Sequence, residues 1–211
     1  MVESNKFIKA GISANVALVL TYPIDIYKIK KQSITNIQNK NWLSYYRGIL
    51  PVMPLTFIEK GIKIYTYDYF KSQFNPNKFS YQAAILSGLS QGIFTTSTDI
   101  LKIRNQVNNY KIPLYRGLHL TWARDVPFNL IFFGISDNYN NSYSKFIGSF
   151  LATSIVTPID VIKTRYSETT NTTLIKTIKN MKFKDYTRGF TPRVLSVGLF
   201  YGITYNLYLY I

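Results

Sequence analysis

The fold of this chain is decided by residues 23–30, which read Pro-Ile-Asp-Ile-Tyr-Lys-Ile-Lys. The pattern returns at residues 97–104 as Ser-Thr-Asp-Ile-Leu-Lys-Ile-Arg, and at residues 158–165 as Pro-Ile-Asp-Val-Ile-Lys-Thr-Arg. Each copy keeps an aspartate, a lysine three residues later and a second cation two residues after that. A motif that recurs at long, similar intervals indicates an internal repeat, which determines the architecture of the whole chain.

A second mark, an Arg-Gly pair, follows each copy of the motif, at residues 47–48, 116–117 and 188–189. The repeating unit is therefore an apolar helix that ends in the motif, a short polar link, the Arg-Gly pair and a second helix. Three such units make six helices in one domain, 1–211. The predicted repeats are residues 1–74, 75–141 and 142–211.

Long uncharged stretches predict that these helices lie in a membrane. Residues 79–98 and 194–211 contain no charged side chain, and residues 10–24 and 146–159 are shorter stretches of the same kind. A membrane-spanning helix needs about 20 mostly apolar residues. The sequence therefore predicts an all-α membrane protein with six transmembrane helices, and a soluble helical protein with buried helices is the alternative.

The composition restricts the chemistry. The net charge of +15 favours an anionic partner such as nucleic acid, anionic lipid or an acidic small molecule. The chain has no cysteine and a single histidine, which excludes disulfides and argues against a metal site. We find no nucleophile–base pair and no phosphate-binding loop, so we expect no catalytic residue, cofactor or metal. The cations recur at helix ends, which argues against a nucleic-acid interface.

The spacing within the motif has a physical use. Proline removes a backbone hydrogen bond and bends a helix, so Pro23 and Pro158 are predicted bend positions, and Ser97 takes that place in the second copy. An aspartate and a lysine three residues apart lie on one helix face. With three such helices around an axis, each aspartate can meet the lysine of the next helix. The alternative is three local pairs, each within its own helix.

These repeated motifs resemble the signature of the mitochondrial carrier family, over essentially the whole chain. The resemblance implies the mitochondrial carrier fold, a pseudo-threefold six-helix bundle with a central cavity, in the mitochondrial inner membrane. It implies that both termini face the intermembrane space and that the protein is a monomer. It also implies lipid, cardiolipin included, at the three Arg-Gly helix ends. A viral source, which the richness in Asn, Ile, Lys and Tyr suggests, would place it in a host membrane.

The resemblance further implies a gate on the matrix side, made of ion pairs between helices. Gln32 and Gln106 stand where the family has bracing glutamines, and Ser167 takes that place in the third repeat. The expected gate pairs are Asp25 with Lys102, Asp99 with Lys163, and Asp160 with Lys28.

Two segments resemble the glutamate and aspartate/glutamate carriers of this family. Residues 59–64 read Glu-Lys-Gly-Ile-Lys-Ile, and residues 124–128 read Arg-Asp-Val-Pro-Phe. Ser196 stands where the aspartate/glutamate carriers have an arginine that the simple glutamate carriers lack. The resemblance therefore implies a carrier of L-glutamate or a related acidic amino acid, moved together with a proton.

The residue types in these segments suit an anionic or zwitterionic small molecule. Arg124 can hold a carboxylate with two hydrogen bonds, and Asp125 or Glu59 can accept the ammonium group. Lys60 and Lys63 lie three residues apart and can take a second carboxylate. Alternatively, Glu59 and Lys63, which lie four residues apart, pair only with each other.

Two departures from the family pattern shape the expectations. The links between residues 32 and 47 and between residues 106 and 116 are short, so we expect shortened matrix loops. The gate on the intermembrane-space side is reduced to Asp68, Lys71 and Asp137, because Asn140 and Leu209 replace charged residues. We therefore expect Asp137 to lack a partner, no ion pair between helices at that end, and a resting protein open to the intermembrane space.

Two other functions stay open. A carrier of another amino acid, or of an amino-acid-derived cofactor such as S-adenosylmethionine, would share the Arg124–Asp125 pattern. A carrier-like membrane protein without transport activity would explain the short links and the reduced gate.

Overall fold

The computed structural model describes residues 2–33, 42–76, 78–107, 109–139, 142–169 and 172–210. Every regular element in these ranges is a helix, which confirms the all-α prediction. Three are short: the 3₁₀ helices η1 (Trp42–Tyr46) and η2 (Phe183–Thr187), and α6 (Leu174–Lys179). The six long helices are α1 (Val2–Gln32), α2 (Ile49–Phe74), α3 (Tyr81–Val107), α4 (Leu118–Asn138), α5 (Ser142–Glu168) and α7 (Phe190–Tyr210).

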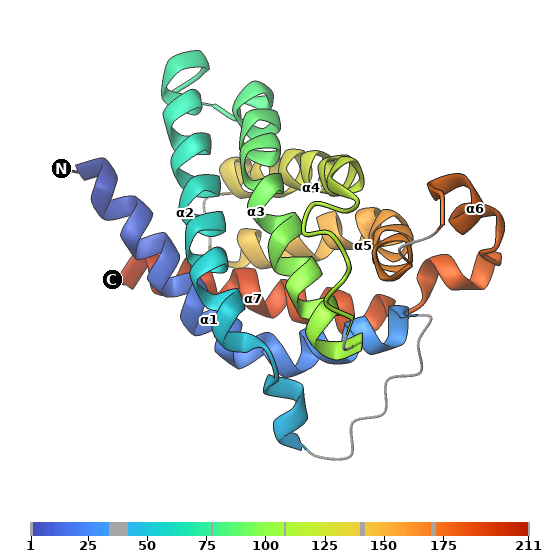
Figure 1. Cartoon of the computed structure of the whole chain (residues 1–211). Helices are drawn as coiled ribbons and strands as arrows, with labels where there is room; N and C mark the ends of the chain where they lie inside the picture. The colour runs from blue at the N-terminus through green and yellow to red at the C-terminus, as the bar shows by residue number, and fades with distance from the viewer. Residues whose placement is uncertain are drawn as a thin grey trace.

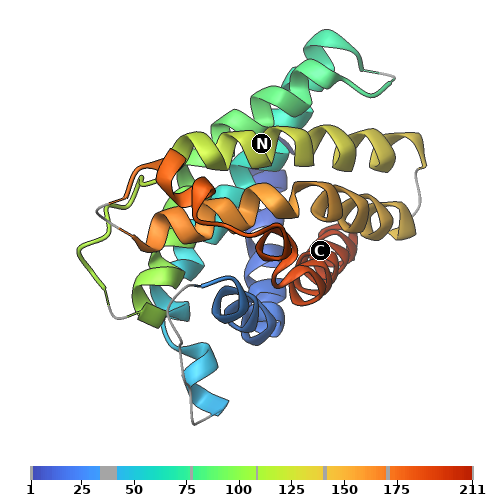
Figure 2. The same ribbon diagram turned by 90° about the vertical axis from the view of Figure 1, so that its right-hand side faces the viewer.

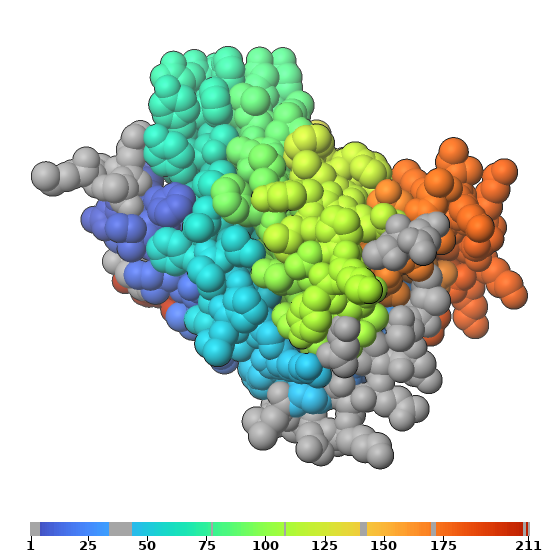
Figure 3. Space-filling model, viewed as in Figure 1, coloured from blue at the N-terminus to red at the C-terminus, as the bar shows by residue number. Residues whose placement is uncertain are grey.

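The six long helices form a closed bundle. Each packs against the next along the chain, and α7 packs against both α5 and α1, so that the last helix returns to the first (Figure 1). Both termini lie on one side of the bundle and α6 lies on the other in Figure 1, and Figure 2 views the bundle from the side of α6. In the space-filling view, the region around α6 stands out at the edge of the molecule (Figure 3).

The helices have the length and the surface of membrane helices. The two shortest of the six have 21 residues, which at about 1.5 Å per residue is enough for a hydrocarbon layer of about 30 Å. Two of the described helices, over residues 5–32 and 143–168, also contain an 18-residue window with a mean hydropathy of 1.4. Among the described residues, more of the buried side chains are polar than apolar, whereas large apolar side chains such as Leu20 and Ile155 are exposed. This distribution suits a protein with a polar interior and a lipid-facing surface.

The Arg-Gly pairs have the same backbone geometry in all three repeats. Gly48, Gly117 and Gly189 have φ angles of 84°, 82° and 75°, in the left-handed region that favours glycine. Each glycine is the residue directly before a helix, namely α2, α4 and α7. The recurring glycine is therefore the residue that allows the chain to turn into the second helix of each unit.

The predicted bend positions lie inside helices. Pro23 and Pro158 stand within α1 and α5. In α3, the hydroxyl of Ser97 donates a hydrogen bond to the carbonyl of Ile93 at 3.2 Å, which is the backbone contact expected of a serine in this place.

The link of the third repeat is folded against the bundle. Arg165, near the end of α5, forms an ion pair with Asp185 of η2 at 2.9 Å. The hydrogen bond from Arg165 lowers the pKa of the Asp185 carboxyl to about 2. This contact therefore stabilises the folded link above the ordinary aspartate pKa, and is lost as the pH falls towards 2. In the first repeat the described part of the link is η1 alone, and residues 34–41 lie outside the described residues.

We predict that Gly48→Ala destabilises the protein. Alanine in the left-handed region costs about 1–2 kcal/mol, and its Cβ would also meet the side chain of Asn105. The measurement is the melting temperature of the purified protein in detergent. The control is Gly134→Ala, inside α4, whose Cβ would have only an ordinary contact with Phe79. That variant should melt at or above the wild-type temperature, and equal losses in both variants would contradict the prediction.

Candidate functional site

Six charged residues form a closed ring of ion pairs between α1, α3 and α5. Each aspartate meets a lysine of another helix, as the repeat pattern predicts, and Lys102, Asp160 and Lys163 are buried. We call this set the ion-pair ring. Its pairs are Lys102–Asp25 at 2.6 Å, Lys163–Asp99 at 2.5 Å and Lys28–Asp160 at 2.8 Å.

Two arginines join the other helices to the ion-pair ring. Arg124 of α4 donates to Asp99 at 3.0 Å and to Asp160 at 2.7 Å. Arg193 of α7 forms an ion pair with Asp160 as well. Asp160, with a side chain only 2% exposed, thus contacts three cations. Because a buried carboxylate is stable only when paired, the ring and the two arginines form one electrostatic unit.

A cavity of about 120 Å³ lies beside this unit. It is lined by residues of α1, α2, α3, α4 and α7, and includes six members of the unit: Asp25, Lys28, Asp99, Lys102, Arg124 and Arg193. Ser196 of α7 also lines it, and donates a hydrogen bond to Asp25. A molecule in this cavity would therefore touch the ion-pair ring directly.

Four of the five predicted substrate-binding residues line the cavity: Glu59, Lys60, Arg124 and Asp125. They form two ion pairs, Lys60 with Glu59 and Arg124 with Asp125, the latter at 2.8 Å. Thr98 donates a hydrogen bond to Glu59 at 3.2 Å. The cavity is thus lined by two ion pairs. Each pair can exchange its internal contact for a contact with a charged ligand.

Lys63, the fifth predicted residue, is not among the cavity-lining residues. It is 1% exposed and donates a hydrogen bond to the hydroxyl of Tyr201 at 2.8 Å. Its ammonium group lies 4.8 Å and 4.7 Å from the ring centres of Phe128 and Phe132. Lys60 donates to the same Tyr201 hydroxyl at 3.4 Å, so the two lysines share one partner, and Glu59 pairs with Lys60 in place of Lys63. Aromatic rings stabilise a cation through their π faces, which accounts for this position.

The predicted brace residues contact the Arg-Gly segments. Gln106 donates to the carbonyl of Arg47 and Ser167 to that of Arg116, both at 3.5 Å. Gln32 is buried next to Gly189, and its side-chain oxygen accepts a hydrogen bond from Thr164 at 3.3 Å. Each of the three thus lies against the Arg-Gly pair of another repeat.

The prediction that Asp137 lacks a partner is wrong. Asp137 accepts hydrogen bonds from Tyr67 at 2.5 Å and from Lys71 at 2.6 Å, which join α2 to α4. The family pattern directed Lys71 towards position 209 on α7. The flexible lysine side chain reaches α4 instead, so an ion pair between helices is present at this end.

Further contacts close the same end. Asp68 pairs with Lys6 of α1 at 3.3 Å, and the rings of Tyr67 and Phe133 stack with centres 3.6 Å apart. Asn140 lies outside the described residues, as does the side chain of Leu209. The expectation of an open end depended on the missing ion pairs, and these contacts remove that basis.

Sequence analysis missed Arg193 and Gln91 as cavity residues. The position of each residue in the sequence could have indicated this. Arg193 stands directly before the uncharged stretch 194–211, and Gln91 lies inside the uncharged stretch 79–98. Polar groups in or beside such stretches usually face the protein interior.

Comparison with known proteins agrees with the resemblance to the mitochondrial carriers. The chain is 25% identical to mitochondrial glutamate carrier 1 of Rattus norvegicus over 242 residues, which covers 76% of this chain and 75% of that carrier. It is 26% identical to a probable calcium-binding mitochondrial carrier of Caenorhabditis elegans. The chain is a homologue of the mitochondrial carriers. These relatives are multi-pass proteins of the mitochondrial inner membrane.

Coverage differs between these carriers. The chain is also 26% identical to an electrogenic aspartate/glutamate antiporter of Homo sapiens. The matches cover 76% of this chain, but 30% of the Caenorhabditis carrier and 32% of the human antiporter, so the chain spans about a third of the length of these two relatives. No family model matches the chain.

We predict that reversing the Asp25–Lys102 pair rescues the defect of either single change. Asp25→Lys or Lys102→Asp alone leaves like charges in a buried ring, which should cost about 3–5 kcal/mol. The double variant restores an ion pair and should recover most of the loss in melting temperature. As a control, Asp25→Lys combined with Lys163→Asp places the opposite charge on a lysine of another pair. Equal behaviour of the two double variants would contradict the pairing.

Proposed function

We propose that this carrier homologue transports an acidic amino acid, L-glutamate above all, across the mitochondrial inner membrane by alternating access and together with a proton. The observation that carries the proposal is the cavity, in which the Arg124–Asp125 and Glu59–Lys60 pairs lie beside the ion-pair ring. A dicarboxylate amino acid needs cations for its carboxylates and an anion for its ammonium group. The printed functions of the glutamate carrier and the aspartate/glutamate antiporter support this substrate class.

The charge of the cavity favours a substrate with one net negative charge. With every group in its ordinary ionised form, the lining carries one more positive than negative charge. Asp160 and Lys163 lie in the adjoining part of the ring and cancel each other. Glutamate at neutral pH carries a single negative charge, whereas S-adenosylmethionine is a cation that the lining would repel. The charged lining residues are Asp25, Lys28, Glu59, Lys60, Asp99, Lys102, Arg124, Asp125 and Arg193.

Binding in this cavity provides a way to open the ring. Arg124 already donates to Asp99 and Asp160, so a substrate carboxylate that binds Arg124 competes with both. Loss of these contacts weakens the attachment of α4 to α3 and α5. A ligand shifts a conformational equilibrium only through such a difference in its binding to the two states. The ion-pair ring would then act as the gate, and substrate as the agent that opens it.

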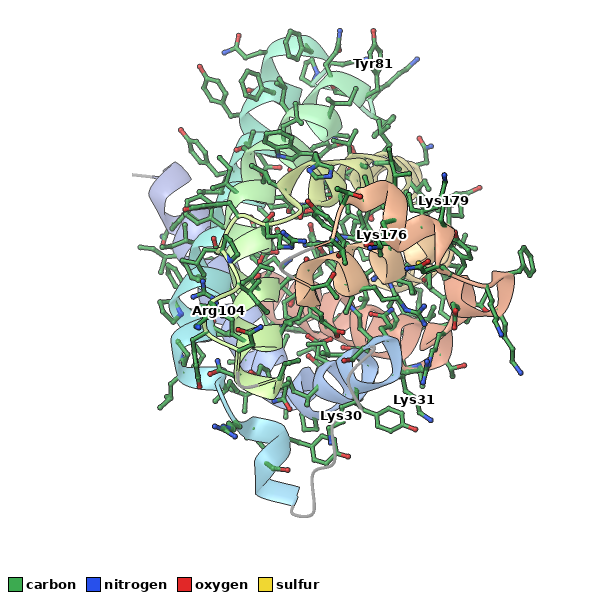
Figure 4. All side chains as sticks on the ribbon, turned by 45° about the vertical axis from the view of Figure 1, so that its right-hand side comes forward. Lys30, Lys31, Tyr81, Arg104, Lys176 and Lys179 are labelled. Carbon is green, nitrogen blue, oxygen red and sulfur yellow. The ribbon has the colours of Figure 1, made fainter. Side chains whose placement is uncertain are left out.

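The distribution of surface charge supports a matrix-facing ring. Lys30 and Lys31 end α1, Arg104 ends α3, and Lys176 and Lys179 lie on α6. Figure 4 shows Tyr81 at the top of the molecule and Lys30 and Lys31 at the bottom, with Lys176 and Lys179 on α6 to the right. Short loops rich in lysine and arginine remain on the side of the membrane from which a protein inserts or is retained. We therefore place this end in the matrix and the termini in the intermembrane space, with Arg47, Arg116 and Arg188 at the level of lipid headgroups.

The test is uptake of labelled L-glutamate into proteoliposomes that contain the full chain, with and without an inward proton gradient. Wild-type uptake should exceed that of empty liposomes and rise with the gradient. Arg124→Ala removes the central cation and should reduce uptake about tenfold or more. Lys176→Ala, an exposed lysine on α6, is the matched control and should transport normally. Lack of uptake of every amino acid and nucleotide would favour a carrier-like protein without transport.

Glu59 is the proposed proton site. We predict that Glu59→Gln abolishes the rise of uptake with an inward proton gradient, because the amide keeps the size of the side chain but cannot take up a proton. The measurement is the ratio of uptake with and without the gradient. Asp125→Asn makes the same chemical change at the other cavity carboxylate and should lower uptake without changing this ratio. A ratio unchanged in Glu59→Gln would contradict the assignment.

A further inference from the structure

Most charged groups in the cavity already have partners, but three of the lining residues each have a buried polar atom without a hydrogen bond. Among the described residues, Nε of Arg193, Oδ2 of Asp125 and Oε1 of Gln91 have no hydrogen-bond partner. The three residues are 4%, 5% and 3% exposed. All three line the same cavity, and they come from three helices, α7, α4 and α3.

Such atoms call for an explanation, because buried polar groups in folded proteins nearly always form hydrogen bonds. An unpaired buried charged group costs more than a neutral one. Three of them around one cavity indicate polar contacts that a ligand completes. Their chemistry limits the ligand, since one atom is a cationic donor, one is an anionic acceptor and one is a neutral acceptor.

We infer that these three atoms form the binding site for the α-amino-acid head group of the substrate. The α-carboxylate accepts a hydrogen bond from Arg193, and the α-ammonium group donates to Asp125 and Gln91. This inference rests on the proposed function and adds to it a residue outside the predicted substrate-binding set, Arg193. A carboxylate and an ammonium group on one carbon need a cation and an anion close to one another, and Arg193 and Asp125 both line this cavity.

In this assignment the two arginines bind different carboxylates of the substrate. Arg124 has contacts with Asp99, Asp125 and Asp160, so it gives up existing bonds when it binds a ligand. Arg193 has a donor available without such an exchange. The head group therefore binds at Arg193 first, and Arg124 is left for the side-chain carboxylate. Arg193 selects for the α-amino acid, whereas Arg124 couples the acidic side chain to the ring.

A competing explanation is that Arg193 serves only the ring, since it also pairs with Asp160. The two roles differ in their response to analogues of the ligand. A head-group role makes binding depend on the α-carboxylate. A ring role affects the stability and opening of the protein, but is indifferent to which analogue occupies the cavity.

The experiment measures the affinity of the purified full chain in detergent for three probes, from the rise in melting temperature on titration. The probes are L-glutamate, 4-aminobutyrate, which lacks the α-carboxylate, and glutarate, which lacks the ammonium group. Wild type should bind each analogue about tenfold or more weakly than glutamate, because each leaves a buried charged group unpaired. Arg193→Gln should bind glutamate and 4-aminobutyrate about equally, yet still prefer glutamate to glutarate. Asp125→Asn should bind glutamate and glutarate about equally, yet still prefer glutamate to 4-aminobutyrate.

The control is Lys176→Gln, which removes an exposed cation on α6, outside the cavity and the ring, and leaves Arg193 in place. It should keep both preferences. Arg193→Lys retains the charge near Asp160 without the guanidinium Nε, and replaces Arg193→Gln if that variant does not fold; it should show a reduced preference for glutamate over 4-aminobutyrate. Arginine variants that retain the full preference would overturn this inference alone. A wild-type protein that binds no amino acid would overturn the proposed function as well.

Discussion

The carboxylate of Asp160 is the constraint on which the rest of the bundle depends. It is buried at the centre of the molecule, and it contacts Lys28 of α1, Arg124 of α4 and Arg193 of α7. A buried charge is tolerated only where opposite charges surround it, so four helices must converge at this point. Because these helices meet at Asp160, Arg124 lies next to Asp99 and Asp125, and these three residues line one part of the cavity. The position of the cavity thus follows from the need to pair one aspartate.

The sequence predicted those features that follow from periodicity. An aspartate and a lysine three residues apart, repeated in three helices, leave few ways to close a ring, and the pairs Asp25–Lys102, Asp99–Lys163 and Asp160–Lys28 are present. The contacts of Lys63 and Lys71 could not be predicted in this way. A lysine side chain can reach neighbours on several helices, and only the packed structure decides between an aromatic cluster, a tyrosine hydroxyl and a carboxylate. The unpaired atoms of Arg193 and Gln91 likewise depend on which groups the other helices bring near them.

The two ends of the bundle are closed by different kinds of interaction. At one end, three ion pairs and two arginines bind the helices through strong, directional contacts. At the other end, stacked rings such as Tyr67 and Phe133 accompany the Lys71–Asp137 pair. A charged ligand in the cavity competes directly with the first kind and has no polar contact to offer the stacked rings. Under the proposed function, substrate would therefore act on the ring end and would leave the aromatic contacts of the other end in place.

Ser97 makes the three repeats mechanically unequal. In α1 and α5, the ring of a proline excludes one backbone hydrogen bond permanently, so the helix axis is weakened by covalent structure. In α3 the peptide N–H is retained, and the local contact is a hydroxyl hydrogen bond that can break and re-form. A straight α3 is therefore accessible at the cost of one weak bond, whereas straight forms of α1 and α5 are not. Thr21 of α1 and Thr157 of α5 form the same hydroxyl contact next to their prolines, so what distinguishes α3 is the retained peptide N–H at Ser97, and the threefold symmetry of the fold need not extend to its motion.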